Sequence, residues 1–174
     1  LRCAKILGQS ELKVLLVEKD ETFGNKVCAG GITRKDLAIL DLPESLIEHR
    51  VIHTAVHSRK RSNITIAPEP VVFTVNRNNL GSWQREQIRS ANVEVLTNSK
   101  VTSIDNGQLI VNGTTTFSFQ YLVGADGINS IVRRHLMIPV KKRLIGIQYT
   151  IPGQFDPKLE VFLDSKYFGT WYAW

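Results

Sequence analysis

A short apolar run, Val14 to Val17, limits the folds that are open to this chain. It lies between Lys13 and Glu18 and contains no polar residue, which is typical of a parallel strand buried on both faces of a sheet. The preceding residues 1–8 carry apolar side chains at helical spacing and end at Gly8, a residue often found at a helix C-terminus. A helix followed by a buried strand predicts an α/β fold with a parallel sheet.

The size and composition fit an ordinary folded protein. The chain has 174 residues, of which 43% are hydrophobic, and no apolar run approaches the roughly 20 residues of a membrane-spanning helix. Its first residues lack both an initiator Met and the apolar centre of a secretory leader, so we expect a piece of a longer, cytoplasmic protein. Cys3 and Cys28 lie too far apart to suggest a disulfide framework or a zinc site.

The charge is basic, with 22 Lys and Arg against 16 Asp and Glu and a pI near 9.5. This balance favours a polyanionic partner. The charges occur as short clusters, Arg59–Arg61, Arg133–Arg134 and Lys141–Arg143, without the interleaved aromatic residues of a nucleic-acid-binding module. We therefore predict solvated surface and no nucleic-acid partner, with a basic binding channel as the alternative.

Local motifs predict several further elements. Residues 33–36 have the spacing of a capping box and predict a short helix that ends before Pro43. The alternating pattern over residues 50–75 predicts strands, and Asn79 is the expected cap of the next helix. Two Asn-Gly pairs, at residues 106–107 and 112–113, predict the turns of a three-stranded antiparallel meander. Strands are also expected at Val93–Leu96, Arg143–Ile151 and Leu159–Trp174.

Three histidines, His49, His53 and His57, recur at every fourth residue. The spacing would align them on a helix, but their β-branched neighbours favour a strand. No carboxylate or thiolate joins them at ligand spacing, so we expect no metal site. No set of nucleophile, base and orienting acid can be assembled from the sequence, which disfavours hydrolysis.

Glu18 stands where the first predicted strand ends. In a dinucleotide-binding βαβ unit, an acidic residue at this position binds a ribose hydroxyl about 20 residues after a glycine-rich turn. Counting back places that turn just before Leu1, so we expect it to precede this sequence. A carboxylate also repels a 2′-phosphate, which predicts an unphosphorylated adenosine. A surface glutamate that only ends a strand fits the spacing equally well.

Residues 123–133 read Val-Gly-Ala-Asp-Gly-Ile-Asn-Ser-Ile-Val-Arg. The pattern predicts a buried strand over Tyr121–Ala125 and then a helix with apolar residues on one face from Ile128 to Leu136. Asp126 and Gly127 stand between the two elements. Free backbone amides at the start of such a helix suit pyrophosphate, and a glycine lets the ligand approach closely.

The same eleven residues resemble the Asp-Gly fingerprint, G-A-D-G-x-x-S-x-V-R, of flavoprotein hydroxylases and reductases of the para-hydroxybenzoate hydroxylase type. Residues 14–19 resemble that family's second strand with its ribose-binding acid, and residues 75–77 resemble its arginine beside the flavin. Residues 26–31 resemble the loop near the isoalloxazine ring in the geranylgeranyl reductase branch. Tyr172-Ala173-Trp174 resembles the start of that branch's Y-x-W-x-F-P substrate motif. The family's glycine-rich turn and its later Gly-Asp segment are not in this sequence.

The resemblance implies a Rossmann-like FAD-binding domain with an antiparallel β-meander and the start of a mixed β substrate domain. The implied FAD-binding domain covers residues 1–136, without its first strand and glycine-rich turn. The substrate domain starts with residues 137–174, and residues 43–75 are expected to contribute to it.

The implied cofactor is FAD, with NAD(P)H or another electron donor. The implied cofactor-binding residues are Glu18, Lys19, Lys26, Arg77, Val101, Asp126 and Gly127. Glu18 would hold the adenosine ribose, Arg77 would neutralise a phosphate, and Asp126 with Gly127 would close on the pyrophosphate. Ser130 and Arg133 match the fingerprint as well, but we expect Ser130 to cap the helix and Arg133 to brace the loop.

Cys28 is the candidate catalytic residue, because a thiol near a flavin ring can donate a proton to a substrate carbon while hydride reaches its neighbour. A buried, inert thiol is the alternative. Tyr172 and Trp174 are the candidate substrate-binding residues, beside Phe168 and Trp171. For these aromatic side chains the alternative is a plain core.

The resemblance implies a FAD-dependent oxidoreductase that reduces carbon–carbon double bonds of an isoprenoid or another apolar small molecule. Such a lipid-like substrate fits a cytoplasmic protein with peripheral membrane contact. The first alternative keeps the flavin and changes the reaction to aromatic monooxygenation. The second is a non-catalytic module that binds nucleotides or nucleic acid, which only the basic charge supports.

Overall fold

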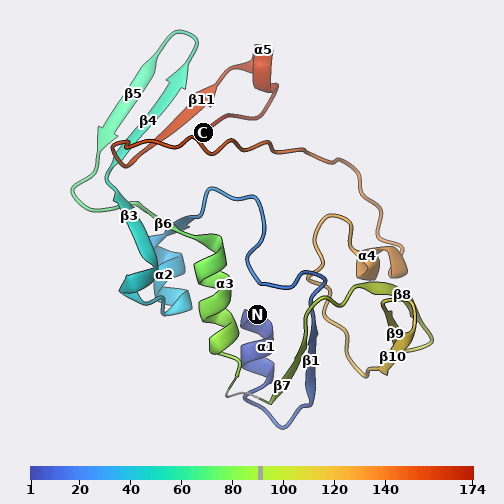
Figure 1. Ribbon diagram of the computed structural model, residues 1–174. Coiled ribbons are helices and arrows are strands. Elements are labelled where there is room, and N and C mark those ends of the chain that lie inside the picture. The colour runs from blue at the N-terminus through green and yellow to red at the C-terminus, as the bar shows by residue number, and fades with distance from the viewer. Residues whose placement is uncertain (90–91) are drawn as a thin grey trace. The chain divides into compact units, whose positions relative to one another are not determined.

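The computed structural model describes residues 1–89 and 92–174 (Figure 1). The chain forms two compact units. Unit 1 comprises residues 1–25 and 81–147, and unit 2 comprises residues 26–80 and 148–174. Both units combine helices with β-sheets, which confirms the predicted α/β class.

Unit 1 contains a parallel strand pair, a meander and two short helices. Its elements are α1 (Arg2–Leu7), β1 (Val14–Val17), β7 (Val93–Leu96), β8 (Val101–Asp105), β9 (Gln108–Val111), β10 (Thr115–Ser118) and α4 (Ile131–His135). β1 runs parallel to β7, with Val14 opposite Val93, as the apolar run predicts. All four residues of β1 are half-buried, not buried on both faces. Among the described residues this sheet has two strands, and so narrow a sheet leaves part of the surface of each strand exposed.

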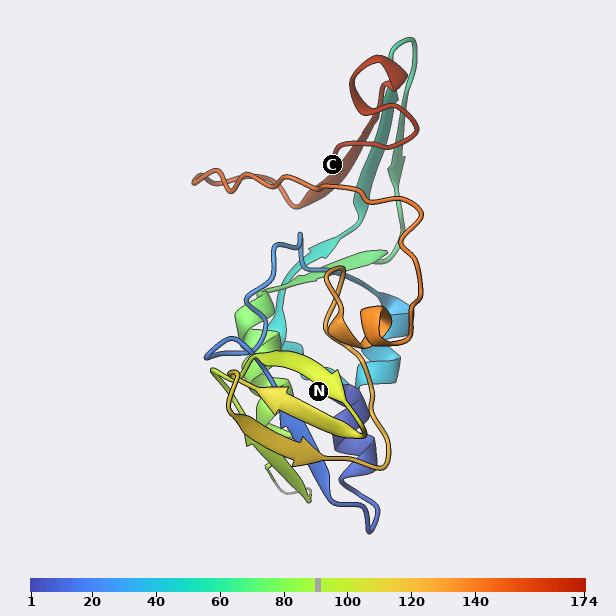
Figure 2. The same ribbon diagram turned by 90° about the vertical axis from the view of Figure 1, so that its right-hand side faces the viewer.

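Strands β8, β9 and β10 form the predicted antiparallel meander, seen as three neighbouring arrows in Figure 2. Each two-residue turn has positive φ at both positions, 44° and 74° at Asn106 and Gly107, and 51° and 78° at Asn112 and Gly113. Asn and Gly tolerate this region best, which is why these pairs set the turns. β9 carries the buried apolar residues of the meander, Leu109 and Val111.

Two strands expected in residues 121–151 are absent from the described structure. Tyr121–Ala125 and Arg143–Ile151 form neither helix nor strand, and Tyr121 is 84% exposed. An alternating or apolar pattern makes a strand only where a neighbouring strand bonds its backbone, and no described strand pairs with either segment. The expected helix over residues 128–136 forms only as α4, with Ile131 and Val132 half-buried.

Unit 2 contains two three-stranded sheets. Its elements are β2 (Gly31–Thr33), α2 (Arg34–Leu40), the 3₁₀ turn η1 (Glu44–Leu46), β3 (Ile47–Val51), β4 (His53–Ser58), β5 (Ser62–Ile66), β6 (Val72–Val75), β11 (Lys158–Leu163) and α5 (Ser165–Phe168). The sheet β2-β6-β3 is antiparallel and carries much of the core, including Ile32, Val51, Phe73 and Val75.

The second sheet of unit 2 has the order β11-β4-β5. β4 and β5 are a hairpin, and β11 joins β4 in parallel, with His53 opposite Lys158. The strand predicted over Leu159–Trp174 is confirmed only in part. β11 ends at Leu163, α5 follows, and Ala173 alone returns to pair with Phe162.

Helix boundaries follow their capping residues. The capping box of α2 is confirmed: the Thr33 N–H donates to Asp36 Oδ2 at 3.1 Å, and the Asp36 N–H donates to Thr33 Oγ1 at 3.4 Å. The expected cap at Asn79 is wrong. Asn76 Oδ1 accepts from the N–H groups of Asn78 and Asn79, so α3 (Arg77–Glu86) begins three residues earlier. α3 continues from unit 2 into unit 1.

None of the helices formed by residues 1–89 and 92–174 combines the length and apolar character that crossing a bilayer requires.

Candidate functional site

Glu18 is anchored at the carboxyl end of the parallel pair β1-β7. Its N–H donates to the Leu96 carbonyl at 2.8 Å, and its carbonyl accepts from the Ser99 N–H at 2.8 Å. Its side chain is half-buried, and Oε1 accepts from the Asp20 N–H at 3.0 Å. The carboxylate is therefore held at the edge of the sheet where ligands of open parallel sheets bind.

Lys19 follows Glu18 in the chain. Val101 comes two residues after Ser99, whose N–H bonds the Glu18 carbonyl. Lys19 is turned toward Asp20, with Nζ 2.8 Å from Oδ1. This hydrogen bond raises the pKa of Lys19 above its ordinary value. Val101 is the first residue of β8, is half-buried and lies opposite Val111. In the described structure the Lys19 ammonium thus donates to Asp20 and not to Glu18, and the apolar Val101 side chain forms no hydrogen bonds.

Asp126 caps helix α4. Its Oδ2 accepts from the N–H of Ile131 at 2.6 Å and from that of Val132 at 3.4 Å. The next amide, of Arg133, donates to Ser130 Oγ at 2.9 Å. The first amides of α4 are thus bonded within the protein. The expectation of free amides for a pyrophosphate at this helix is therefore wrong.

The two structural roles expected beside Asp126 are confirmed. Ser130 is buried and caps α4. Arg133 Nη1 donates to the carbonyl of Ile128 at 2.7 Å and so braces the loop in front of the helix. Together with the bonds of Asp126, these contacts fasten both ends of the turn at residues 127–129 to α4.

The pKa of Asp126 lies below its ordinary value. Partial burial raises this pKa, but hydrogen bonds from Ser130 and from the backbone N–H of Ile131 and Val132 together lower it more. Because the side chain stays largely exposed, these hydrogen bonds set the direction. Asp126 is consequently a carboxylate at neutral pH and accepts hydrogen bonds only.

Two positions of the fingerprint require glycine, each for a different structural reason. Gly127 has φ of +74°, a conformation that side chains with a Cβ rarely adopt. Gly124 packs on α4: a Cβ there would lie 2.7 Å from the Cβ of Val132. The fingerprint spacing therefore encodes a turn and a close approach between the loop and the helix.

Glu18 and Asp126 are attached to one stretch of unit 1. Glu18 bonds to Leu96, the last residue of β7, and to Ser99 in the connection to β8. α4, which Asp126 caps, packs against β8, and Figure 1 shows the two elements side by side. The early acid and the helix that Asp126 caps therefore both contact residues 96–105, Glu18 before β8 and α4 on β8 itself.

The other predicted site residues belong to unit 2. Lys26 and Cys28 are exposed, and Cys28 Sγ lies 3.5 Å from the Gly30 N–H. The Cys28 thiol is therefore not buried, contrary to the alternative. Arg77 is the first residue of α3 and is half-buried. Its Nε atom is buried and has no hydrogen-bond partner among the described residues.

Tyr172 and Trp174 flank the bridge between Ala173 and Phe162, in which the two backbones bond at 2.8 and 3.0 Å. Their rings meet edge to face, with centroids 6.2 Å apart. They are 51% and 55% exposed, so the alternative of a plain aromatic core is wrong for this pair. They form an accessible aromatic surface.

The sequence analysis did not predict one row of polar side chains, formed by Ser62, His57 and Glu160. His57 on β4 has Nδ1 2.9 Å from Ser62 Oγ on β5 and Nε2 3.4 Å from Glu160 Oε1 on β11. Phe162 stacks on the imidazole at 4.7 Å. The three polar residues face one another because their strands are neighbours, and Glu160 lies about a hundred residues from the other two, so no spacing signals the row. The strand predicted for the histidines is confirmed, with His49 in β3 and His53 and His57 in β4.

Comparison with known proteins shows the fold. No protein-family model matches the chain. An uncharacterized protein of Methanosarcina barkeri is 30% identical over 154 residues, which cover 85% of this chain and 39% of that protein. This chain thus spans about two fifths of the curated relative.

Two solved structures share the architecture. One is PqsL of Pseudomonas aeruginosa, described as a probable FAD-dependent monooxygenase, with 20% identity and a TM-score of 0.61 over 82% of this chain and 43% of that one. The other is a geranylgeranyl bacteriochlorophyll reductase-like protein of Thermoplasma acidophilum, with 22% identity and a TM-score of 0.52 over 61% of this chain and 29% of that one. The chain has the fold of FAD-binding, monooxygenase-like proteins.

Proposed function

We propose that this chain is the cofactor-binding part of a FAD-dependent oxidoreductase. The observation that carries the proposal is that Glu18 and the Asp126-capped helix α4 both contact the same stretch, residues 96–105. An acid that ends a parallel strand and a braced Asp-Gly turn are the parts that a dinucleotide site requires. The fold shared with flavoproteins supports this proposal.

The residues of unit 1 fit the adenosine and pyrophosphate end of FAD. Glu18 would accept hydrogen bonds from the ribose hydroxyls, since its carboxylate is half-buried and held by the Asp20 amide. Asp126 would act through the turn that it holds. It bonds the first N–H groups of α4, and the turn at residues 127–129 would then face the ligand. Gly127 leaves open space where a Cβ would be, which would let the phosphates approach the backbone.

Arg77 fits an anion within unit 2. A buried guanidinium nitrogen without a partner is costly unless a ligand or water bonds it. The residue also opens α3, whose positive dipole end favours negative charge. Arg77 would therefore bind a phosphate or ribityl oxygen of the cofactor. Lys26 would add positive charge from the loop that bonds to β6 through Gly30 and Val75.

The exposed aromatic pair supports the proposed substrate class. When bound, FAD supplies the hydride chemistry. Tyr172 and Trp174 would contact an apolar chain, and the exposed Cys28 thiol would donate a proton to the carbon next to the one that receives hydride. We propose reduction of a carbon–carbon double bond of an isoprenoid, with NAD(P)H or another donor as the source of electrons.

Aromatic monooxygenation is the second candidate. The likeness to the probable FAD-dependent monooxygenase PqsL covers more of this chain and has a higher TM-score than the likeness to the reductase-like protein. The use of oxygen distinguishes the two reactions by experiment. Oxygen uptake tied to product formation supports the monooxygenase, and anaerobic saturation of a double bond supports the reductase.

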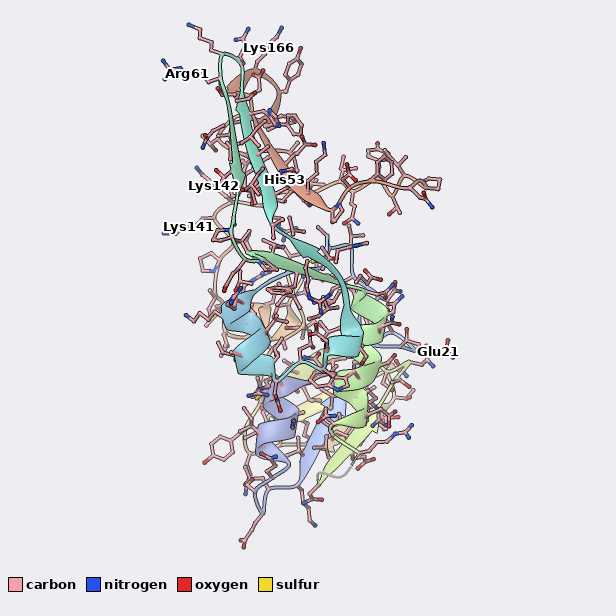
Figure 3. The ribbon with its side chains drawn as sticks, turned by 90° about the vertical axis from the view of Figure 1, so that its left-hand side faces the viewer. Glu21, His53, Arg61, Lys141, Lys142 and Lys166 are labelled. Atoms are coloured by element: carbon pink, nitrogen blue, oxygen red, sulfur yellow. The ribbon has the colours of Figure 1, made fainter. Side chains whose placement is uncertain are left out.

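Flavin binding is tested on the complete protein by its absorption spectrum and by mass identification of the released cofactor. The matched variants are Glu18→Gln and Glu21→Gln, because both remove one carboxylate and Glu21 points outward from the same loop (Figure 3). Loss of a charged hydrogen bond should weaken FAD binding about tenfold for Glu18→Gln. Glu21→Gln should bind normally. Equal affinities, or a protein that binds no flavin, would overturn the proposal.

Cys28 is tested separately. Cys28→Ala should slow substrate reduction in the complete protein and leave its flavin content intact. Unchanged turnover would remove the proposed proton donor without affecting the proposed cofactor.

A further inference from the structure

The two Asn-Gly turns of the meander have the same kind of backbone. All four residues, Asn106, Gly107, Asn112 and Gly113, have positive φ and are exposed. A Cβ on either glycine would meet no heavy atom within 4 Å, and neither glycine N–H donates a backbone hydrogen bond in the part of the chain that the structure describes. The backbone and the free space around the glycines are thus alike in the two turns.

The two asparagine side chains are held differently. Asn112 Oδ1 accepts from the Lys100 N–H at 2.8 Å, and Asn112 Nδ2 donates to the Asn98 carbonyl at 3.2 Å. The backbone N–H of Asn112 also donates to the Lys100 carbonyl at 2.8 Å. Asn106 has a single side-chain contact among the described residues, from Nδ2 to the exposed carboxylate of its neighbour Asp105 at 3.3 Å. Asn112 is therefore tied to the segment before β8, whereas the Asn106 amide reaches only the adjacent residue.

Asn-Gly pairs can deamidate in water without an enzyme. The deprotonated backbone nitrogen of the glycine attacks Cγ of the asparagine, a new C–N bond forms, the bond from Cγ to the amide nitrogen breaks, and ammonia leaves. Water then opens the resulting cyclic imide at one of its two carbonyls and leaves aspartate or isoaspartate. Glycine favours the attack because it has no side chain in the way and its backbone rotates freely.

We propose that Asn106 is a site of spontaneous deamidation and that the hydrogen bonds of Asn112 protect the second Asn-Gly pair. Because the two backbones are alike, the side-chain contacts set the difference in rate. Asn112 has to give up two hydrogen bonds before its Cγ can be attacked, and Asn106 gives up one exposed contact. A hydrogen bond of this kind is worth several-fold in an equilibrium, so Asn106 should react about tenfold faster than Asn112.

Deamidation would change the turn that joins β8 to β9. Aspartate at position 106 would place a second carboxylate beside Asp105, and isoaspartate would add a methylene to the backbone of a two-residue turn. Asp105 pairs with Gln108 across this turn, and α4 packs on β8. The modified chain should therefore be less stable than the parent chain. The turn lies wholly in unit 1, and the proposal does not depend on flavin binding.

The test is incubation of the full chain at mildly alkaline pH, followed by digestion and tandem mass spectrometry of samples taken over time. The fragment masses locate the replacement of the amide NH₂ by OH at either asparagine. Conversion should be about tenfold faster at Asn106 than at Asn112, and it should accelerate as the pH rises because the attacking nitrogen must be deprotonated. Equal rates, a faster rate at Asn112, or no conversion of Asn106 would overturn the proposal.

The unfolded chain is the matched control, since it keeps both Asn-Gly pairs and loses the contacts of Asn112. In concentrated guanidinium chloride the two rates should agree within about threefold, because no hydrogen bond then protects Asn112. A tenfold difference that persists in the unfolded chain would assign the effect to the flanking sequence and contradict protection by the fold.

A variant of the first turn confirms the position. Asn106→Gln lengthens the side chain by one methylene, so ring closure by the Gly107 nitrogen becomes unfavourable and the early mass change should disappear. The slow conversion of Asn112 should remain. An early mass change that survives Asn106→Gln would place the reactive amide elsewhere in the chain and exclude Asn106 as the site.

Discussion

The meander of unit 1 and the sheet β11-β4-β5 of unit 2 are both three-stranded, but they are built differently. The meander joins residues 101–118 through two Asn-Gly turns. The other sheet pairs β4 with β11, whose residues lie about a hundred positions later. The meander buries Leu109 and Val111, whereas Ile64 and Ile66 on β5 are 66% and 65% exposed.

This difference separates two sources of stability. A two-residue turn closes a strand pair at little entropic cost, but pairing strands far apart in sequence orders a long connection. Buried side chains then add most of the stabilising free energy. We therefore expect substitutions in the meander to cost more than matched substitutions in the sheet β11-β4-β5.

The largest effect is expected for the buried leucine of the meander. Leu109→Ala should lower the free energy of unfolding by about 2–4 kcal/mol, because it removes buried methyl groups and leaves a cavity. The matched change Ile64→Ala, on exposed β5, should cost less than about 1 kcal/mol. Urea denaturation measures both. Equal costs would contradict the proposed difference between the two sheets.

The second prediction concerns the turn between β9 and β10. Asn112 has φ of 51°, its Oδ1 accepts from the Lys100 N–H at 2.8 Å, and its Nδ2 donates to the Asn98 carbonyl at 3.2 Å. Asn112→Ala should cost about 1–2 kcal/mol through the lost hydrogen bonds and the strained backbone. Asn63→Ala on β5 is the control and should stay within about 0.5 kcal/mol.

Acid should loosen the helix that packs on the meander. Because the folded-state pKa of Asp126 is depressed below 3.8, its contribution is present above that ordinary value and is lost as the pH falls through the folded pKa. Asp126→Asn should therefore flatten the fall in stability with pH in this window. Unfolding by urea at several pH values measures the slope, and an unchanged slope would exclude this cap as its source.

The sheet of unit 2 has its own acid-sensitive group, Glu160. Its pKa is lowered mainly by the hydrogen bond and the charge of Lys158 and less by His57, while burial opposes this shift. The contribution has the same sign as that of Asp126, but the main partner of Glu160 is the exposed Lys158 side chain, whereas Asp126 is bonded by backbone N–H groups of α4. Glu160→Gln should consequently change the acid slope less than Asp126→Asn does.

The smallest effect is expected for an exposed ion pair of unit 2. Arg59 Nε lies 3.7 Å from Asp164 Oδ2, and surface pairs of this kind contribute little. Arg59→Gln should change the free energy of unfolding by less than about 0.5 kcal/mol. A larger loss would mean that the β4–β5 hairpin depends on its contact with the segment after β11.

Elements with local signals could be predicted from the sequence, and elements that need a distant partner could not. The Asn-Gly turns, the Thr33–Asp36 capping box and β1 appear where they were expected. The strand predicted over Arg143–Ile151 has the right alternation, but an alternating pattern does not show whether another strand lies beside it. Asn76 caps α3 in place of the predicted Asn79. Both asparagines can cap a helix, and only the folded backbone decides which one does.

The site divides in the same way. The sequence alone determined the Asp-Gly fingerprint, its glycine positions and the acid after β1, because each depends on residues that are neighbours in the chain. Only the tertiary structure decided that Asp126 bonds the amides of α4, that Glu18 and α4 both contact residues 96–105, and that Ser62, His57 and Glu160 form one row. Such contacts depend on which distant backbones pack together, and local residue patterns do not encode that choice.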